Sequence, residues 1–170
     1  IQLLNLSQPL RLPMTWVPPA MSPLWQLELS YFHWLAPRHD PLLGMAYMVD
    51  WLDQEETPVH HPAWNPFGVA QRVLQWTRLL SAWRPHLEHH PQWQRVIRAL
   101  YRQGRFLAAH QEFEFLGNHL LKTAVGWYAA GCFFDTAEAA RWRQRAGRII
   151  IAQAREQVLA DGGHYERSPM

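Results

Sequence analysis

An asparagine and a histidine stand side by side at Asn118 and His119, where the segment "NHLLKTAVGWYAAGCFF" begins. The residues after them are almost wholly apolar, which is typical of a helix buried on all sides. Asparagine is a common helix N-cap, because its side chain accepts a hydrogen bond from a free amide of the first turn. The same end of a helix favours an anion. The pair is therefore either a cap beside a partly buried histidine or part of a site for a carboxylate.

A second polar stretch, "ADGGHYERSP", covers residues 160–169. Its two glycines permit backbone conformations that other residues avoid. The stretch is either an exit loop after a helix or a loop that presents substrate-binding side chains to a cleft, namely His164, Tyr165, Glu166 and Arg167.

Trp64 and Asn65 lie in an expected loop between two helices, and both are candidates for contact with a sugar ring. Most of the ten tryptophans are expected to pack between helices, since aromatic residues at helical spacing usually belong to a core. Trp64 is the one we single out as a stacking surface.

Histidines also cluster at residues 60–61 and 86–90. Both groups lie in expected breaks between helices, and no carboxylate or cysteine completes a familiar ligand spacing. We expect no metal and no cofactor in this region. The single cysteine, Cys132, excludes an internal disulfide framework and is expected to be a small buried hydrophobe.

Six segments with apolar residues at helical spacing would position these side chains. A proline-punctuated, extended arm over residues 1–21 precedes them. Ser22-Pro23 and Asp40-Pro41 are typical helix starts, and "DTAE" at 135–138 has the pattern of a capping box. The expected helices cover residues 23–35, 41–54, 66–83, 91–115, 118–134 and 135–159.

Short connections between these helices predict antiparallel neighbours. The fifth helix is apolar all round and is expected to be an inner element, whereas the sixth carries "RWRQRAGR" and is expected to be an outer one. Alternating inner and outer helices are the layout of an α/α solenoid or toroid. The sequence therefore predicts an all-α fold, a partial α/α toroid in a single domain over residues 1–170.

The overall charge excludes some classes of partner. The chain has 170 residues, a formal net charge of +2 and no run of basic residues, so we expect no nucleic-acid binding. Lys122 is the single lysine, so the basic residues are nearly all arginine, whose forked donors suit carboxylates and sulfates. No apolar window is long enough to span a membrane, and no signal-peptide pattern is present.

Several stretches resemble one family. "FLGNHLLKTAVGWYAAGCFF" and "AARWRQRAGRIIIAQAREQVLADGGHYERSPM" closely resemble the heparinase II/III-like polysaccharide lyases, in which a Gly/Ser-Asn-His helix start is followed by an "ADGGHFERSPMYH" segment. "LWQLELSYFHWLAPRHD" and "AWNPFGVAQRVLQWTRLL" are similar to two further regions of that family. The resemblance implies an α/α toroid followed by an antiparallel β-sandwich region, of which this chain would hold part of the toroid.

The resemblance implies β-elimination on a uronic-acid polysaccharide, such as a glycosaminoglycan or alginate. In that reaction the carboxylate on C5 is neutralised, a base takes the C5 proton and an acid protonates the leaving oxygen. The family pattern assigns the carboxylate to Asn118 and an assisting role to His119. The catalytic tyrosine of the family would follow Met170, so residues 1–170 alone are expected to be inactive without the remainder of the chain. A periplasmic or cell-envelope location is also implied.

Two alternatives stay open beside the lyase. The first is a non-catalytic helical module that binds glycan or supports surface-polysaccharide assembly. The second is a glycoside hydrolase, which would need two carboxylates around the bond, whereas the candidates here are an amide and an imidazole. Glu112 and Glu114 lie just before Asn118 and either orient it or form a solvated helix end. The family often continues "NHLLxNAKAL", where this chain has residues 123–126 as "TAVG".

Overall fold

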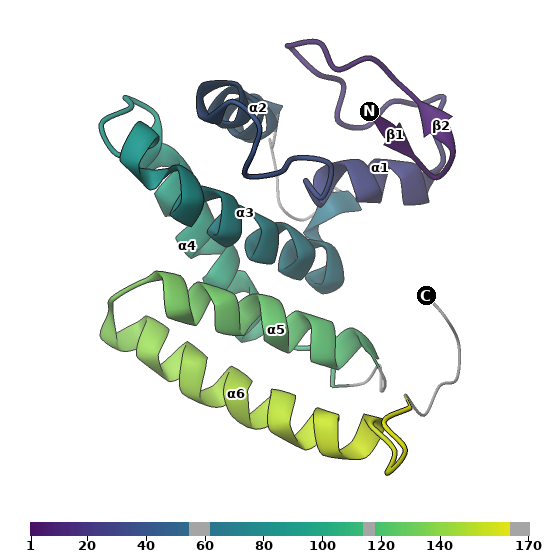
Figure 1. The fold of residues 1–170 in the computed structure, drawn as a ribbon, viewed down its shortest axis with the longest axis vertical. Helices are drawn as coiled ribbons and strands as arrows, with labels where there is room; N and C mark the ends of the chain where they lie inside the picture. The colour runs from purple at the N-terminus through teal and green to yellow at the C-terminus, as the bar shows by residue number, and fades with distance from the viewer. Residues whose placement is uncertain (55–61, 114–117, 164–170) are drawn as a thin grey trace.

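The computed structural model describes residues 1–54, 62–113 and 118–163, and its elements are almost all helical (Figure 1). A small antiparallel hairpin opens the chain, and the prediction of an all-α fold is confirmed. The elements are β1 (Gln2–Leu3), β2 (Leu6–Ser7), α1 (Pro23–Ser30), α2 (Pro41–Gln54), the 3-10 helix η1 (Pro62–Trp64), α3 (Pro66–Leu87), α4 (Trp93–Ala109), α5 (Asn118–Phe133) and α6 (Ala137–Gln157).

The helices form neighbouring antiparallel pairs. In Figure 1, α5 and α6 lie side by side at one end of the molecule, α3 crosses the middle, and α1, α2 and the hairpin lie at the other end. The inner helix α5 packs against α3, α4 and α6. The partial α/α toroid remains a prediction beyond this all-α arrangement. In the part of the chain that the structure covers, no helix is both long and apolar enough to cross a membrane.

The predicted helix starts are mostly confirmed. Ser22 caps α1 by accepting a hydrogen bond from the Trp25 amide at 3.3 Å, and Asp40 Oδ1 accepts from the Leu42 amide at 2.8 Å as α2 begins. The capping box over residues 135–138 is wrong. Thr136 is the cap of α6, because its hydroxyl accepts from the Ala139 amide at 3.1 Å.

The first helix ends five residues earlier than predicted. The chain leaves the helix after Ser30 and turns at Phe32, which has a φ of 63°. This left-handed conformation is uncommon for a large side chain. It places the fully buried Phe32 ring against Trp16 at 5.0 Å and Trp34 at 5.7 Å between ring centroids. Burial of one aromatic ring therefore overrides the helical pattern of the sequence.

Three other helix ends differ from the prediction by two residues or more. The helix α3 continues through Pro85 to the fully buried Leu87, although Pro85 has no amide to donate to the Ser81 carbonyl. The helix α4 ends at Ala109 instead of residue 115, since His110 leaves the helical conformation with φ −125° and ψ 53°. The helix α6 ends at Gln157 instead of residue 159.

The buried Arg72 side chain connects α3 to four other elements. Its Nε donates to Gln103 Oε1 of α4 at 2.8 Å, and its Nη1 donates to the Ser30 carbonyl of α1 at 3.4 Å. Both Nη1 and Nη2 donate to the Ala63 carbonyl of η1 at 3.2 Å, and the guanidinium lies 4.2 Å from the Trp51 ring centroid of α2. Because Arg72 is fully buried, these partners replace water around its charge.

Asp50 of α2 attaches the N-terminal arm to the helices. Its Oδ2 accepts hydrogen bonds from Trp16 Nε1 at 2.8 Å and from the Met14 amide at 3.0 Å. Gln54, one turn later on α2, donates to the Met14 carbonyl at 2.7 Å. The extended arm therefore covers the aromatic core at a fixed position.

Two glycines allow α5 to approach both of its neighbours closely. A Cβ atom added at Gly126 would lie 2.5 Å from the Ala70 carbonyl oxygen of α3, and one at Gly131 would lie 2.6 Å from the Arg143 amide nitrogen of α6. The prediction that Cys132 is buried is wrong. Gly131 faces α6, so the next residue turns away from that contact and its side chain is exposed.

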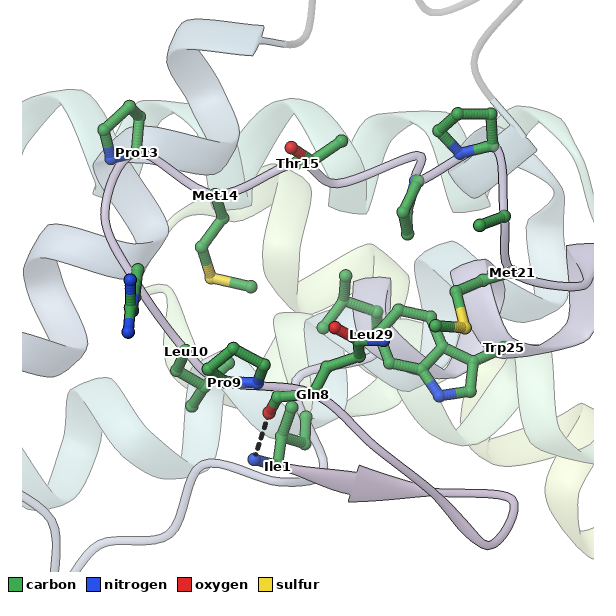
Figure 2. A pocket seen from close by; sticks show the side chains of 14 residues that line it. Ile1, Gln8, Pro9, Leu10, Pro13, Met14, Thr15, Met21, Trp25 and Leu29 are labelled. Carbon is green, nitrogen blue, oxygen red and sulfur yellow. Dashed lines mark hydrogen bonds between the residues drawn. The ribbon is translucent and has the colours of Figure 1, made fainter.

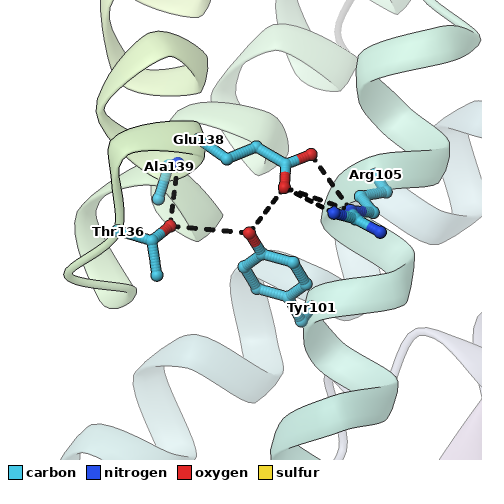
Figure 3. A network of polar contacts seen from close by, with 5 residues as sticks. All are labelled: Tyr101, Arg105, Thr136, Glu138 and Ala139. Atoms are coloured by element: carbon cyan, nitrogen blue, oxygen red, sulfur yellow. Dashed lines mark hydrogen bonds and ion pairs between the residues drawn. The ribbon is translucent and has the colours of Figure 1, made fainter.

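A polar network joins α4 to the start of α6 (Figure 3). The Glu138 carboxylate accepts hydrogen bonds from Arg105 Nη2 at 2.8 Å and from the Tyr101 hydroxyl at 2.7 Å. The bond from Arg105, followed by that from Tyr101, holds the pKa of Glu138 below its ordinary value. The residue that the sequence analysis assigned to a capping box therefore connects two helices.

Replacement of Arg72 by methionine is expected to lower the free energy of unfolding by about 3 kcal/mol, because buried carbonyl and amide groups lose their donor. Arg72→Lys is expected to recover little of this free energy of unfolding, since an ammonium lacks the planar set of donors of a guanidinium. Urea unfolding followed by tryptophan fluorescence measures both. The exposed Arg78→Met on the same helix is the control. A change in Arg72→Met no larger than in this control would contradict the role of Arg72.

Replacement of Glu138 by glutamine is expected to destabilise the fold in a pH-dependent way. The pKa of Glu138 is lower in the folded chain than its ordinary 4.5, so the carboxylate stabilises the fold above pH 4.5. That contribution is lost as the pH falls through the lowered pKa. The difference in unfolding free energy between wild type and Glu138→Gln should therefore shrink on acidification. Glu88→Gln, which breaks a pair within one helix end, serves as a control, and a pH-independent difference would refute the prediction.

Candidate functional site

Asn118 and His119 both lie in the first turn of α5. The described part of α5 begins at Asn118, and the residues just before it, 114–117, lie outside the described ranges. The Asn118 side chain is half-buried and that of His119 is exposed. Both side chains are thus placed at the end of α5 where amide groups and the helix dipole favour an anion.

His119 has contacts on two sides. Its ring lies 4.9 Å from the Phe67 ring of α3, measured between centroids. On the other side, its Nδ1 lies 3.7 Å from Glu112 Oε2, an ion-pair distance when the imidazole is protonated. The Glu112 side chain is largely buried and therefore well placed to orient His119. Glu114 lies outside the described residues.

A row of aromatic rings leads from His119 to the turn that follows α1. Phe67 lies edge-on to Tyr31 at 6.1 Å, and Tyr31 lies 5.7 Å from the His33 ring, both between centroids. Burial, reinforced by the negative charge of Glu28, raises the pKa of Tyr31 to about 12, although Arg72 opposes the shift. Tyr31 therefore remains a neutral phenol at physiological pH.

His33, Gln71 and Lys122 form a polar group at the far end of this row. The His33 side chain is exposed overall, but partial desolvation of its ring, followed by the positive charge of Lys122, lowers its pKa, while a hydrogen bond with Gln71 acts in the opposite direction. His33 is therefore neutral at pH 7. The group joins three elements, because His33 follows α1, Gln71 belongs to α3 and Lys122 belongs to α5.

The sequence analysis missed these three residues, although a spacing signal was present. Lys122 lies four residues after Asn118, and Gln71 lies four residues after Phe67, so each pair shares a helix face. His33 lies in a segment that was expected to be helical and is a turn instead. Its proximity to α5 depends on the chain reversal at Phe32.

Trp64 and Asn65 both have structural contacts in the fold. Trp64 lies in the core instead of an exposed loop, with its ring edge-on to Phe106 at 5.0 Å between centroids. Asn65 caps α3, because its Oδ1 accepts from the Gly68 amide at 2.7 Å. A Cβ atom at Gly68 would lie near both Asn65 and Tyr31, so Asn65 borders the row of rings. The predicted positions His164, Tyr165, Glu166 and Arg167 lie outside the described residues.

A cavity of about 420 Å³ lies elsewhere, between the N-terminal arm and α1 (Figure 2). Its lining is mostly apolar, with Pro9, Met14, Trp25 and Leu29 among the residues around it. It shares no lining residue with the site at α5. Across residues 1–54, 62–113 and 118–163, the His, Cys, Asp and Glu side chains form no group of three that could hold a metal ion.

The arrangement at α5 places an amide, an ammonium and two imidazoles on α5 and on the turn that follows α1. Asn118 and Lys122 are hydrogen-bond donors, and Lys122 is also a positive charge. His33 is a neutral imidazole, and His119 has an acidic partner in Glu112. Such a set can bind a carboxylate and take part in proton transfer.

Comparisons with known proteins identify the family of the chain. A heparin-sulfate lyase of Bacteroides stercoris is 31% identical over 110 residues, which cover 63% of this chain and only 16% of that protein. No solved structure matches the chain. The family model described as the heparinase II/III N-terminus matches residues 26–170, a stretch that runs from α1 past α6 and includes the whole α5 site. The chain therefore belongs to the heparinase II/III family.

Proposed function

We propose that the protein is a polysaccharide lyase that cleaves an acidic, uronate-containing polysaccharide by β-elimination. The observation that supports this most directly is the pairing of Asn118 with Lys122, one turn apart on α5, next to the neutral imidazole of His33. The heparin-sulfate lyase relative supports the same reaction class, although the matched region is a small part of that protein.

The first requirement of β-elimination is neutralisation of the C5 carboxylate, because the C5 proton is otherwise too weakly acidic to remove. In this proposal the Asn118 amide donates a hydrogen bond to the carboxylate. The Lys122 ammonium adds positive charge, and the positive end of the α5 dipole acts in the same direction. Donors held in place before the reaction stabilise the charge that develops on the carboxylate as the proton leaves.

The two histidines have different roles in this proposal. Glu112 orients His119 from the buried side, and His119 assists Asn118. His33 is kept neutral by partial desolvation of its ring and by Lys122, so it adds no charge repulsion beside the ammonium and can accept a hydrogen bond from the sugar. The tyrosine acid that the family resemblance implies would come from beyond Met170.

Replacement of Asn118 by alanine in the full-length protein is expected to lower kcat/KM by about 10²- to 10³-fold, as for other donors that stabilise developing negative charge. Formation of the unsaturated uronate product, followed by its ultraviolet absorbance, measures the change. Gln144→Ala, which removes an exposed amide of α6, is the control. Lyase activity near that of this control in a folded Asn118→Ala protein would contradict the proposal. A wild-type protein that binds acidic polysaccharide without product would favour the non-catalytic module instead.

The pKa of His33 is expected to respond to the charges around it. Lys122→Met removes a positive charge that disfavours the imidazolium, so the pKa of His33 should rise. A bound uronate oligosaccharide places a carboxylate nearby and should also raise it. A pH titration of the imidazole resonances by NMR measures both shifts, with the exposed Arg78→Met as a charge control. An unchanged pKa on addition of saturating oligosaccharide would place the carboxylate elsewhere.

A further inference from the structure

Four exposed arginines form a line along the outer face of α6: Arg141, Arg145, Arg148 and Arg155. Their separations of four, three and seven residues place them on one side of the helix. With a rise of 1.5 Å per residue, Arg141, Arg148 and Arg155 are spaced by about 10.5 Å, and the line extends over about 21 Å. In Figure 1, α6 lies at the edge of the molecule, with α5 on its opposite side.

Arg141 lies near the Glu138 carboxylate of the same helix, whereas the other three arginines of the strip have no ion pair with a described residue of α6. Glu138 is engaged by Arg105 and Tyr101 of α4, and Glu156 accepts a hydrogen bond from Gln153. Over the ranges that the structure describes, neither a hydrogen bond nor an ion pair engages Arg145, Arg148 or Arg155. A guanidinium binds a carboxylate or a sulfate through two parallel hydrogen bonds. The strip therefore offers several strong donors that the fold itself does not use.

The spacing of the strip favours a linear polymer over a small anion. The guanidinium groups of the strip are distributed over about 21 Å of helix axis, a length that one phosphate or sulfate ion cannot contact at once. They suit a chain whose negative groups recur at about the length of a disaccharide. Duplex nucleic acid carries one charge per about 1.7 Å, and its binding generally needs a much larger excess of positive charge than the net +2 of this chain.

The direction of the strip relates it to the site on α5. The two helices are antiparallel and meet at Gly131 and Arg143, near the end of α5 and the start of α6. The C-terminal end of α6, with Arg155, therefore lies at the same end of the helix pair as Asn118 (Figure 1). A polymer that follows the strip from Arg141 to Arg155 is led toward the first turn of α5.

We propose that the arginine strip is a second binding site for the acidic polysaccharide, apart from the α5 site, that holds a long chain while its uronate end or an internal unit contacts Asn118. The substrate class rests on the function proposed above. Two linked contacts on one polymer raise its local concentration at the α5 site, so the strip strengthens binding of long chains and leaves short oligosaccharides unaffected.

The test compares two triple variants of the full-length protein with the same change of charge. The strip variant is Arg141→Gln, Arg148→Gln and Arg155→Gln, and the control variant is Arg11→Gln, Arg78→Gln and Arg84→Gln, whose exposed residues are scattered. The probes are fluorescently labelled heparan sulfate and alginate, and the polymer that wild type binds more tightly is used. The strip variant should raise the Kd of the long polymer about tenfold and flatten its dependence on salt, as expected for fewer ionic contacts. The control variant should not.

Three results would overturn the proposal. The first is a strip variant that binds the long polymer as the control variant does. The second is a strip variant that loses affinity for single-stranded oligo(dT) as strongly as for the polysaccharide, which would mean unspecific anion binding. The third result comes from wild-type protein treated with an arginine-specific glyoxal reagent and analysed by mass spectrometry. Heparan sulfate or alginate should protect Arg148 and Arg155 from this reagent. Equal reaction of these arginines with and without polymer, or no reaction at all, would exclude the site.

Failure of the strip and failure of the lyase are distinguishable. Turnover of a uronate tetrasaccharide depends on Asn118 and should be unchanged in the strip variant. A protein that forms no unsaturated product, but whose polymer binding depends on the strip, would keep this inference and refute the lyase. Normal turnover of the tetrasaccharide, together with polymer binding that does not depend on the strip, would support the lyase and refute this inference.

Discussion

A buried positive charge is costly unless polar groups surround it, and the guanidinium of Arg72 imposes this condition on the whole N-terminal half of the fold. Two of its partners are carbonyls at the ends of α1 and η1, where helices leave such groups without intrahelical donors. The arginine thus completes helix ends that would otherwise need water in a dry core. Because α1, α2, η1 and α4 all contact one side chain of α3, none of them can move without leaving a buried charge poorly solvated.

This constraint fixes the wall of the site opposite α5. The end of α1 at Ser30 decides where the chain turns, and the turn at Phe32 places Tyr31 and His33 on the side that faces Phe67 and Gln71. The same helix, α3, therefore supplies the buried Arg72 on one face and the site residues next to it on another. The site and the core are neighbouring faces of a single helix, which explains how a turn without regular structure holds an imidazole at a reproducible position.

Much of the fold could be predicted from the sequence, because the helix starts depend on local chemistry. Ser22 and Asp40 act within a few residues of their own positions, and short loops leave antiparallel pairing as the simple outcome. Helix ends depended on tertiary packing. Phe32 takes a left-handed conformation because its ring is buried. Glu138 pairs with Arg105 of another helix instead of completing the predicted capping box. Neither effect appears in a local pattern.

The candidate site could be predicted only in part for a similar reason. Asn118 and His119 adjoin each other in the sequence, so their pairing is visible without a structure. Three other site residues come from three different segments: His33, Gln71 and Lys122. Within its own segment, none of them belongs to a sequence pattern that indicates a site. The spacing of Lys122 from Asn118 identifies a shared helix face, but only the fold shows that this face meets the turn after α1. Trp64 shows the opposite case, since a loop position by sequence became a core position through Phe106 and Arg72.

The two glycines of α5 have a consequence for how the site can change shape. At Gly126 and Gly131 the backbone of α5 touches the backbones of α3 and α6 without side chains between them. Contacts between backbones leave no side chains whose rotamers could change to let the helices shift. The three helices are therefore expected to move as one rigid unit. In the proposed site, a change of width would therefore involve the turn that carries His33 instead of α5. The side chains of Asn118 and Lys122 on α5 would keep their positions while that turn moves relative to them.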